Sequence, residues 1–189
     1  MRNRSYQGLT DQALMLELVH RHPESNLHVI DLPYRLSSWA LDDPENARLW
    51  FDGDGTLRAW AVVQSPFWSI DYAVDAPDPE LPGAVLDWAV QRAQALKGNP
   101  FYARPAWFVS VLAGQTGAMQ TLAAKGFTDQ MHVAEDPWSK VFMTRPVDPP
   151  LEMPTLPPGY RLRALHGESE ISAYVALQRA VFELSLIHI

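Results

Sequence analysis

Histidines and carboxylates that stand close together are the first candidates for metal or acid–base chemistry. His20 and His22 are two residues apart, so on a helix they point to different faces, and a solvated helix end competes with a metal pair. Residues 52–55, Asp-Gly-Asp-Gly, could begin a calcium loop, but the later bidentate Glu is lacking and Asp-Gly favours a turn. The sequence has no Cys and no His-Glu-x-x-His motif. We therefore expect no metal site and no disulfide.

The composition is that of a globular chain. Of 189 residues, 47% are hydrophobic and 20% charged, and the length exceeds one domain of about 150 residues. The net charge of −7 argues against nucleic acid or an anionic membrane as the main partner. The apolar runs are shorter than the ~20 residues that span a bilayer, and the polar N-terminus does not resemble a secretory signal. We expect a cytoplasmic protein.

Helices are predicted where apolar residues recur at helical spacing between start and stop signals. Thr10 and Asp11 are N-cap candidates for the first helix. Pro82 suits the first turn of a later helix, which Gly98 ends, and Gly126 ends the last of them. The expected helices cover residues 10–22, 32–41, 82–97 and 117–125.

Strands are predicted around the Asp-Gly turn and in one continuous apolar run. Residues 47–51 and 56–64 form a hairpin, and residues 67–74 add a third antiparallel strand. Residues 106–112 are apolar throughout, which predicts a strand buried on both faces. Further extended runs are residues 127–134 and 140–144. The fold class expected is α/β (α+β), with a mixed, mainly antiparallel sheet flanked by helices.

Prolines mark a domain boundary. Residues 146–158 predict a stiff linker, because they contain Pro146, Pro149, Pro150, Pro154, Pro157 and Pro158. Beyond it we expect a strand over residues 159–165 and a helix over residues 168–182, which cannot bury a core by themselves. The domains are thus residues 1–145 and 159–183, the second being only the beginning of a fold.

The last six residues, 184–189, follow the final helix abruptly and without a cap. Back-translated, they resemble a transposase-adapter sequence used in DNA library preparation. We therefore expect read-through at this end, and His188 is not counted as a functional histidine.

The order strand, strand, strand, helix, strand, helix, strand, strand resembles the GCN5-related N-acetyltransferases (GNAT). The match includes Leu122-Ala123-Ala124-Lys125-Gly126-Phe127 at the close of the second helix of this series. Residues 158–163, Pro-Gly-Tyr-Arg-Leu-Arg, together with residues 173–182, are similar to the first strand and helix of another copy. The resemblance implies an acyl-CoA N-acyltransferase-like fold, of the tandem type, with a truncated second domain.

The resemblance also implies where acetyl-CoA would bind. In this family the pantetheine arm lies between two splayed strands, which correspond to residues 67–74 and 106–112 here. The pyrophosphate lies on amides at the start of the next helix, where the dipole favours an anion. The candidate cofactor-binding residues are Val74, Gly83 and Ala84.

The loop between these candidates departs from the family pattern. Three of its residues are prolines, which have no N–H, and Asp75, Asp78 and Glu80 would repel a pyrophosphate. An ordinary loop into a helix is therefore the favoured alternative to a CoA site.

The family's catalytic positions are poorly matched as well. Where many members have an acidic Tyr, this chain has Leu122, which cannot donate a proton. Asp71 lies on the strand that often carries the base, with Tyr72 on the opposite face; the alternative is a strand-edge carboxylate exposed to water. No catalytic residue is assigned. Core packing rather than ligand stacking is expected of Trp50, Trp60, Trp68, Trp88 and Trp107.

The resemblance implies that the parent protein is an N-acetyltransferase, an acyltransferase that moves an acetyl group from acetyl-CoA to an amine. This chain would be its non-catalytic N-terminal part, with a small-molecule amine as substrate of the whole and the missing C-terminal GNAT domain as partner in cis. The alternatives are a non-enzymatic acyl-CoA or small-ligand binding module and a structural partner domain.

Overall fold

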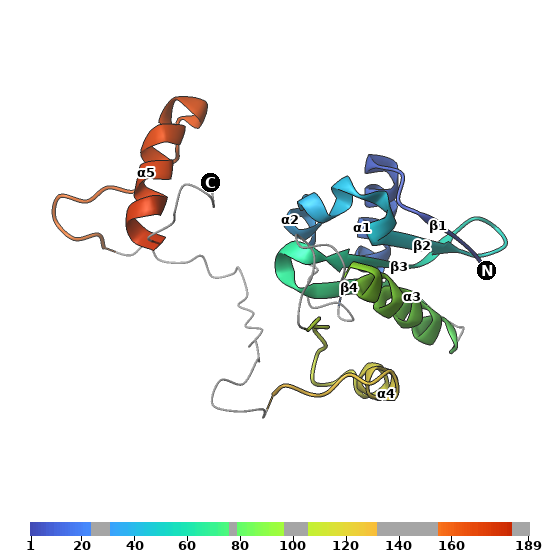
Figure 1. Cartoon of the computed structure of the whole chain (residues 1–189). Helices are drawn as coiled ribbons and strands as arrows, with labels where there is room; N and C mark the ends of the chain where they lie inside the picture. The colour runs from blue at the N-terminus through green and yellow to red at the C-terminus, as the bar shows by residue number, and fades with distance from the viewer. Residues whose placement is uncertain (24–30, 76–78, 97–105, 132–154, 183–189) are drawn as a thin grey trace. The chain divides into compact units, whose positions relative to one another are not determined.

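The computed structural model describes residues 1–23, 31–75, 79–96, 106–131 and 155–182 (Figure 1). The chain divides into two compact units, Met1–Ser139 and Lys140–Ile189. The predicted linker lies outside the described residues up to position 154, as do the strand predicted over 140–144 and the last seven residues. The domain limits expected from the sequence, residues 1–145 and 159–183, therefore remain predictions.

The first unit is built on a four-stranded antiparallel sheet in the order β1-β2-β3-β4. The strands are β1 (Arg2–Ser5), β2 (Ala47–Phe51), β3 (Leu57–Gln64) and β4 (Ser69–Val74). The predicted hairpin is confirmed, with Ala47 opposite Val62, and so is the meander that continues into β4. The edge strand β1 was not predicted, because its four residues are polar and show no alternation.

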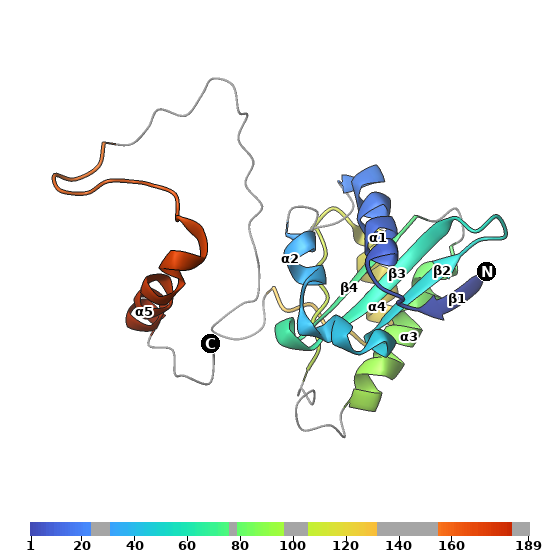
Figure 2. The same ribbon diagram turned by 90° about the horizontal axis from the view of Figure 1, so that it is seen from above.

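Helices cover both faces of this sheet, which makes the fold α+β as expected. In Figures 1 and 2, α1 (Leu9–Arg21) and α2 (Leu32–Leu36) lie over one face and α3 (Leu81–Ala95) over the other. The helix α4 (Thr116–Ala124) contacts α3 and lies farther from the sheet. Short 3-10 turns connect these elements: η2 (Trp39–Asp42), η3 (Pro44–Asn46) and η4 (Ser65–Phe67).

The helix predictions are right in position and wrong in two details. The cap of α1 is Gly8, whose φ is 109°, whereas Asp11 lies inside the first turn and binds Arg4. Asp11 accepts two hydrogen bonds from that guanidinium, at 2.5 and 2.6 Å, which ties β1 to α1. The helix predicted over residues 32–41 is split, because α2 ends at Leu36 and a separate 3-10 turn follows.

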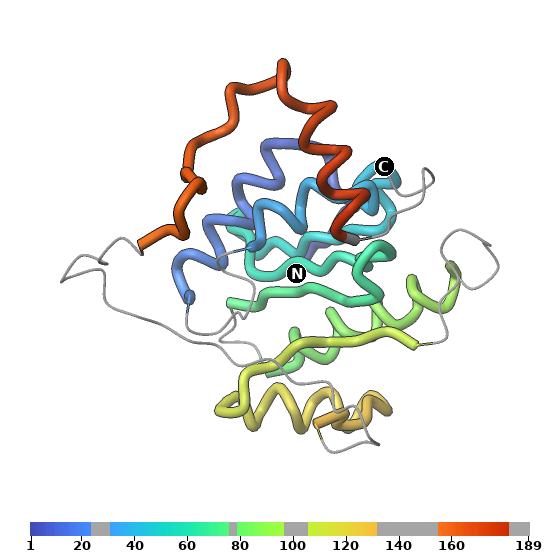
Figure 3. The backbone as a smooth tube through the Cα atoms, turned by 90° about the vertical axis from the view of Figure 1, so that its left-hand side faces the viewer, coloured from blue at the N-terminus to red at the C-terminus, as the bar shows by residue number. Residues whose placement is uncertain are grey.

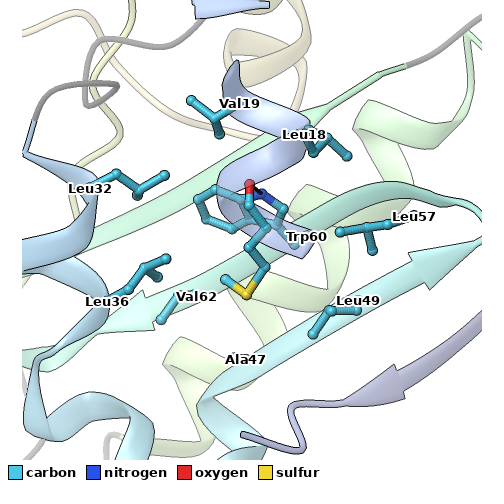
Figure 4. Close-up of a cluster of buried hydrophobic side chains, with 10 residues drawn as sticks. Leu18, Val19, Leu32, Leu36, Ala47, Leu49, Leu57, Trp60 and Val62 are labelled. Carbon is cyan, nitrogen blue, oxygen red and sulfur yellow. Dashed lines mark hydrogen bonds between the residues drawn. The ribbon is translucent and has the colours of Figure 1, made fainter. Parts of the chain in front are cut away.

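Strand β3 separates two apolar layers, because its successive side chains point to opposite faces. On the α1 side Trp60 is fully buried, and its indole N–H donates to the Met15 carbonyl at 3.1 Å (Figure 4). On the α3 side Ala59, Ala61 and Val63 pack against that helix. The sheet is thus held between two cores, and β4 lies at its edge.

The run at residues 106–112 differs from its prediction. It is not a strand buried on both faces, since its side chains are exposed or half-buried and a single parallel bridge joins Phe108 to Ser69. Figure 3 shows this segment (yellow-green) beside β4, with α4 beyond it. Residues 127–130 are not strand either, and the predicted run continues outside the described residues. An apolar run becomes a strand buried on both faces only where other elements cover each of its faces.

The described part of the second unit is a turn and a helix. The helix α5 (Ile171–Phe182) confirms the prediction, and η6 (Gly167–Glu170) precedes it. The strand predicted over residues 159–165 is wrong: these residues pair with no strand that the structure describes. A single extended segment has no ladder to join, which is the physical reason.

Candidate functional site

The outer edge of β4, which does not pair with β3, faces the segment of residues 106–112. Its inner edge pairs with β3 along the whole strand. On the outer edge, the Ile70 N–H donates to the Phe108 carbonyl and the Phe108 N–H donates to the Trp68 carbonyl, both at 2.8 Å. Among the described residues, one isolated parallel bridge, between Ser69 and Phe108, joins this edge to the 106–112 segment.

A cavity of about 210 Å³ occupies this region beside β4. Its walls come from both sides of the sheet: Leu32 and Trp60 from the α1 side, and Pro82 together with α4 from the other. The full lining is Leu32, Trp60, Ile70, Asp71, Tyr72, Ala73, Val74, Pro82, Ser110, Val111, Gln115, Gly117, Ala118 and Thr121. The lining combines apolar side chains with polar ones such as Asp71, Ser110 and Thr121, and small-molecule sites also combine both kinds.

The three candidate cofactor residues fall in different places. Val74, at the end of β4, lines the cavity. Gly83 and Ala84 lie in the first turns of α3 and do not line it, although Pro82 beside them does. The Ala84 N–H already donates to the Glu80 carbonyl at 3.1 Å, so it is not available to an anion. A Cβ placed on Gly83 would lie 4.0 Å from the Lys125 ammonium nitrogen, which puts one cation beside this helix start.

The negative charge of Asp75, at the start of the loop before α3, is offset by positive groups that the loop sequence did not indicate. Asp75 accepts from Arg21 at 2.9 Å and from Arg58 at 3.3 Å, and His22 lies 3.5 Å away. Two guanidinium groups therefore offset the carboxylate that we expected to repel a phosphate. Sequence reasoning missed these partners because they come from α1 and β3, and no spacing along the chain indicates them.

His22, the C-cap residue of α1, thus lies beside Asp75. Among the described residues, no group of three or more His, Cys, Asp and Glu side chains could hold a metal ion. The other metal candidate, Asp52, caps its own turn by accepting from the N–H groups of Asp54 and Thr56 and from Arg58. The Thr56 N–H and Arg58 lower the pKa of Asp52, so it remains a carboxylate committed to the turn.

Asp71 is a buried partner of Arg35, and the prediction of a water-exposed carboxylate is wrong. The residue is 4% exposed. Arg35 donates from Nε to Oδ2 at 2.8 Å and from Nη2 to Oδ1 at 2.6 Å. Ser69 adds a hydroxyl bond to Oδ1 at 3.3 Å, and the guanidinium lies 4.4 Å from the Phe67 ring centre. Arg35 and Ser69 together hold this carboxylate in a fixed position inside the protein.

Tyr72, Thr121 and Leu122 are the described groups at the positions where an acid was sought. Tyr72 lies on the opposite face from Asp71, as expected, and packs with the α3-side cluster. Burial raises the pKa of the Tyr72 phenol, which makes it a weaker proton donor. Leu122 is buried, and the Thr121 hydroxyl before it donates to the Gly117 carbonyl at 2.9 Å.

Four of the five tryptophans named from the sequence pack as expected. Trp60 and Trp50 are buried, Trp88 meets Trp50 edge-on at 5.7 Å, and Trp107 packs beside the α3-side core. Trp68 differs, because it is 43% exposed and adopts a left-handed φ of 53° between η4 and β4. Its backbone turns the chain into β4 and accepts the bond from Phe108.

No protein-family model and no curated protein matches this chain. In the part of the chain that the structure describes, no helix is long and apolar enough to cross a membrane. The site therefore has to be interpreted from its own geometry.

Proposed function

We propose that the first unit is a GNAT-like domain that binds acetyl-CoA without turning it over, as the non-catalytic N-terminal part of a cytoplasmic N-acetyltransferase. The whole protein would transfer the acetyl group to a small-molecule amine, with the chemistry carried by a C-terminal GNAT domain in cis. Binding by this unit would position or sense the acyl donor.

The observation that carries this proposal is the cavity beside β4. The strand meets the 106–112 segment at one parallel bridge, and the cavity is lined both by β4 and by Ser110 and Val111 of that segment. A cavity along a strand edge fits an extended, narrow ligand such as the pantetheine arm, whose amides can bond to that edge. The succession of β2, β3, β4, α3 and α4 supports the same proposal, although the strand expected between the two helices is absent from the described residues.

The proposal of a non-catalytic role is supported by the groups around the cavity. Asp71 is held by Arg35, the phenol of Tyr72 has a raised pKa, and Leu122 stands at the expected acid position. General acid–base catalysis requires a group that can take a proton and another that can give one, both within reach of the reacting atoms.

Calorimetric titration of acetyl-CoA into the full chain tests the proposal. We expect saturable heat for the unchanged chain, and loss of that heat for Gly117→Leu. Gly117 lines the cavity and a Cβ added there meets no atom within 4 Å, so a leucine side chain can be introduced at this wall. Gly114→Leu is the matched control, because it also points into open space but lies outside the lining.

Each outcome of this titration has a meaning. If the unchanged chain releases no heat at high micromolar acetyl-CoA, the binding function is overturned. If the two leucine variants release equal heat, acetyl-CoA binds outside this cavity. Release of free CoA thiol by this chain in the presence of amines would contradict the non-catalytic role. A purely structural role then remains, favoured by the exposed apolar side chains of α5.

A further inference from the structure

The buried Arg35–Asp71 pair lies at the wall of the cavity. Asp71 lines the cavity, and so does Leu32, which lies one turn before Arg35 on α2. By strand alternation the Asp71 side chain lies on the α2 face, as its bonds to Arg35 require. A charged side chain, Asp71, is therefore part of the cavity wall, and its partner Arg35 lies outside the lining.

The hydrogen-bond capacity of this carboxylate is not filled. Two carboxylate oxygens offer about four acceptor positions. Oδ1 accepts from Arg35 Nη2 and from Ser69, whereas Oδ2 accepts from Arg35 Nε. Among the described residues, no further donor reaches Asp71, so one acceptor position on Oδ2 is open. An open position on a buried polar group beside a cavity is a place for a ligand donor.

The charges around this position limit the class of ligand. A cationic ligand would approach Asp71 beside the Arg35 guanidinium, which already offsets the carboxylate and would repel a second cation. An anionic ligand would meet the carboxylate itself. A neutral N–H or O–H donor avoids both repulsions and satisfies the open acceptor.

We infer that Asp71 is the hydrogen-bond acceptor of the cavity and that Arg35 restricts the site to neutral donors such as an amide N–H. Arg35 acts through Asp71 and is a positioning residue. The inference rests on the proposed ligand-binding role of the cavity and names the chemistry of its ligand. It does not require that the ligand be acetyl-CoA.

The test uses three small probes on the full chain: N-methylacetamide, methylammonium and acetate. The ¹⁵N-labelled chain is titrated to ~50 mM of each, since ligands of a few atoms bind in the millimolar range. The backbone amides of Leu32 and Val111 report from opposite walls of the cavity. We expect saturable shifts with N-methylacetamide and none with the two ions.

Two variants connect this readout to the pair. Arg35→Met/Asp71→Ala removes both charges together, so neither is left unpaired, and the alanine cannot fill the cavity. It should lose the N-methylacetamide shifts. The single change Arg35→Met leaves the carboxylate uncompensated, and methylammonium should then produce the shifts instead. Arg4→Met/Asp11→Asn removes the other doubly bonded Arg–Asp pair, outside the cavity, and should bind as the unchanged chain does.

The inference and the proposed function fail in different ways. Persistence of the amide shifts in the double variant, shifts with acetate or methylammonium in the unchanged chain, or no shifts with any probe would overturn the inference. If Arg35→Met does not fold, the double variant still decides. If acetyl-CoA binding releases heat but the N-methylacetamide shifts do not depend on Asp71, the proposed function stands and the inference fails. If N-methylacetamide produces shifts that depend on Asp71 but acetyl-CoA produces no heat, the inference stands and the proposed function fails.

Discussion

In the first unit, Trp60, Met15 and Leu86 are completely buried, whereas in the second Tyr160, Leu162 and Leu177 are 75%, 74% and 58% exposed. Both regions are rich in apolar residues, so composition does not separate them. The first unit has a sheet with helices on both faces, and the described part of the second has one helix and an extended segment. Burial requires a second layer, and the number of packed elements decides whether an apolar side chain becomes core.

The largest expected effect comes from Trp60 in the first unit. Trp60→Ala removes a fully buried indole and its hydrogen bond to Met15, which should lower the free energy of unfolding by about 3–5 kcal/mol. Tyr174→Ala in α5 should change the free energy of unfolding measured for the same transition by no more than about 0.5 kcal/mol, because this side chain is exposed. Urea unfolding followed by tryptophan fluorescence and far-UV circular dichroism measures both.

The comparison breaks if the two variants have similar effects. A large loss with Tyr174→Ala would mean that α5 packs cooperatively with a core. A small loss with Trp60→Ala would mean that the α1-side core contributes little to folding.

A smaller effect is expected from glycines with a left-handed backbone. Gly126 ends α4 at φ 85°, and the Phe127 N–H donates back to the Leu122 carbonyl at 3.1 Å. Gly126→Ala should lower the free energy of unfolding of the first unit by about 1 kcal/mol, because a Cβ is strained at this φ. Gly159 has φ 88° in the second unit, and Gly159→Ala should leave the first transition unchanged. Equal losses in both variants would show that the units unfold together.

How far the sequence predicts these features depends on how local their causes are. The hairpin was predictable from Asp-Gly between alternating strands, and the stop of α4 from Gly126, since both follow from neighbouring residues. The strand at 106–112 was predicted wrongly because an apolar run does not say whether a second strand will cover it. Strand β1 was missed because pairing with β2, not its own polar residues, makes it a strand.

The site was less predictable than the fold for the same reason. Val74 could be placed from the order of elements, and it does line the cavity. The bonds of Asp71 to Arg35 and of Asp75 to Arg21 join residues 36 and 54 positions apart. No periodicity or motif connects such residues, because only the packing of α1 and α2 on the sheet brings them together.

The exposed apolar side chains of α5 should also distinguish the second unit from the first in solution. Ile171, Tyr174, Leu177 and Val181 recur at helical spacing and are all exposed. We expect the full chain to bind the dye ANS and to self-associate with rising concentration, and Leu177→Lys to weaken both. Ser172→Lys, which adds the same charge to an exposed polar position of the same helix, is the control. Light scattering that finds a clean monomer at all concentrations would count against a docking role for this face.

The smallest expected effect is a local one, at the start of α5. Arg163 donates two hydrogen bonds to Glu170, at 2.7 and 2.5 Å, and the His166 N–H adds another at 2.8 Å. Arg163 and this N–H lower the pKa of Glu170 from 4.5 to about 2. Because the folded pKa is depressed, the contacts are fully present above pH 4.5 and are lost as the pH falls through about 2.

In the first unit Arg4 lowers the pKa of Asp11 by the same kind of contact, but there the carboxylate is buried between β1 and α1. Protonating Asp11 should therefore weaken the packing of two elements, whereas protonating Glu170 should loosen only the turn before α5. NMR titration of the side-chain carboxyl carbons measures both groups. Arg163→Met should return the Glu170 midpoint towards 4.5, and Arg161→Met should leave it near 2. A Glu170 midpoint that stays low without Arg163 would assign the shift to the His166 N–H, and the turn alone would then order this carboxylate.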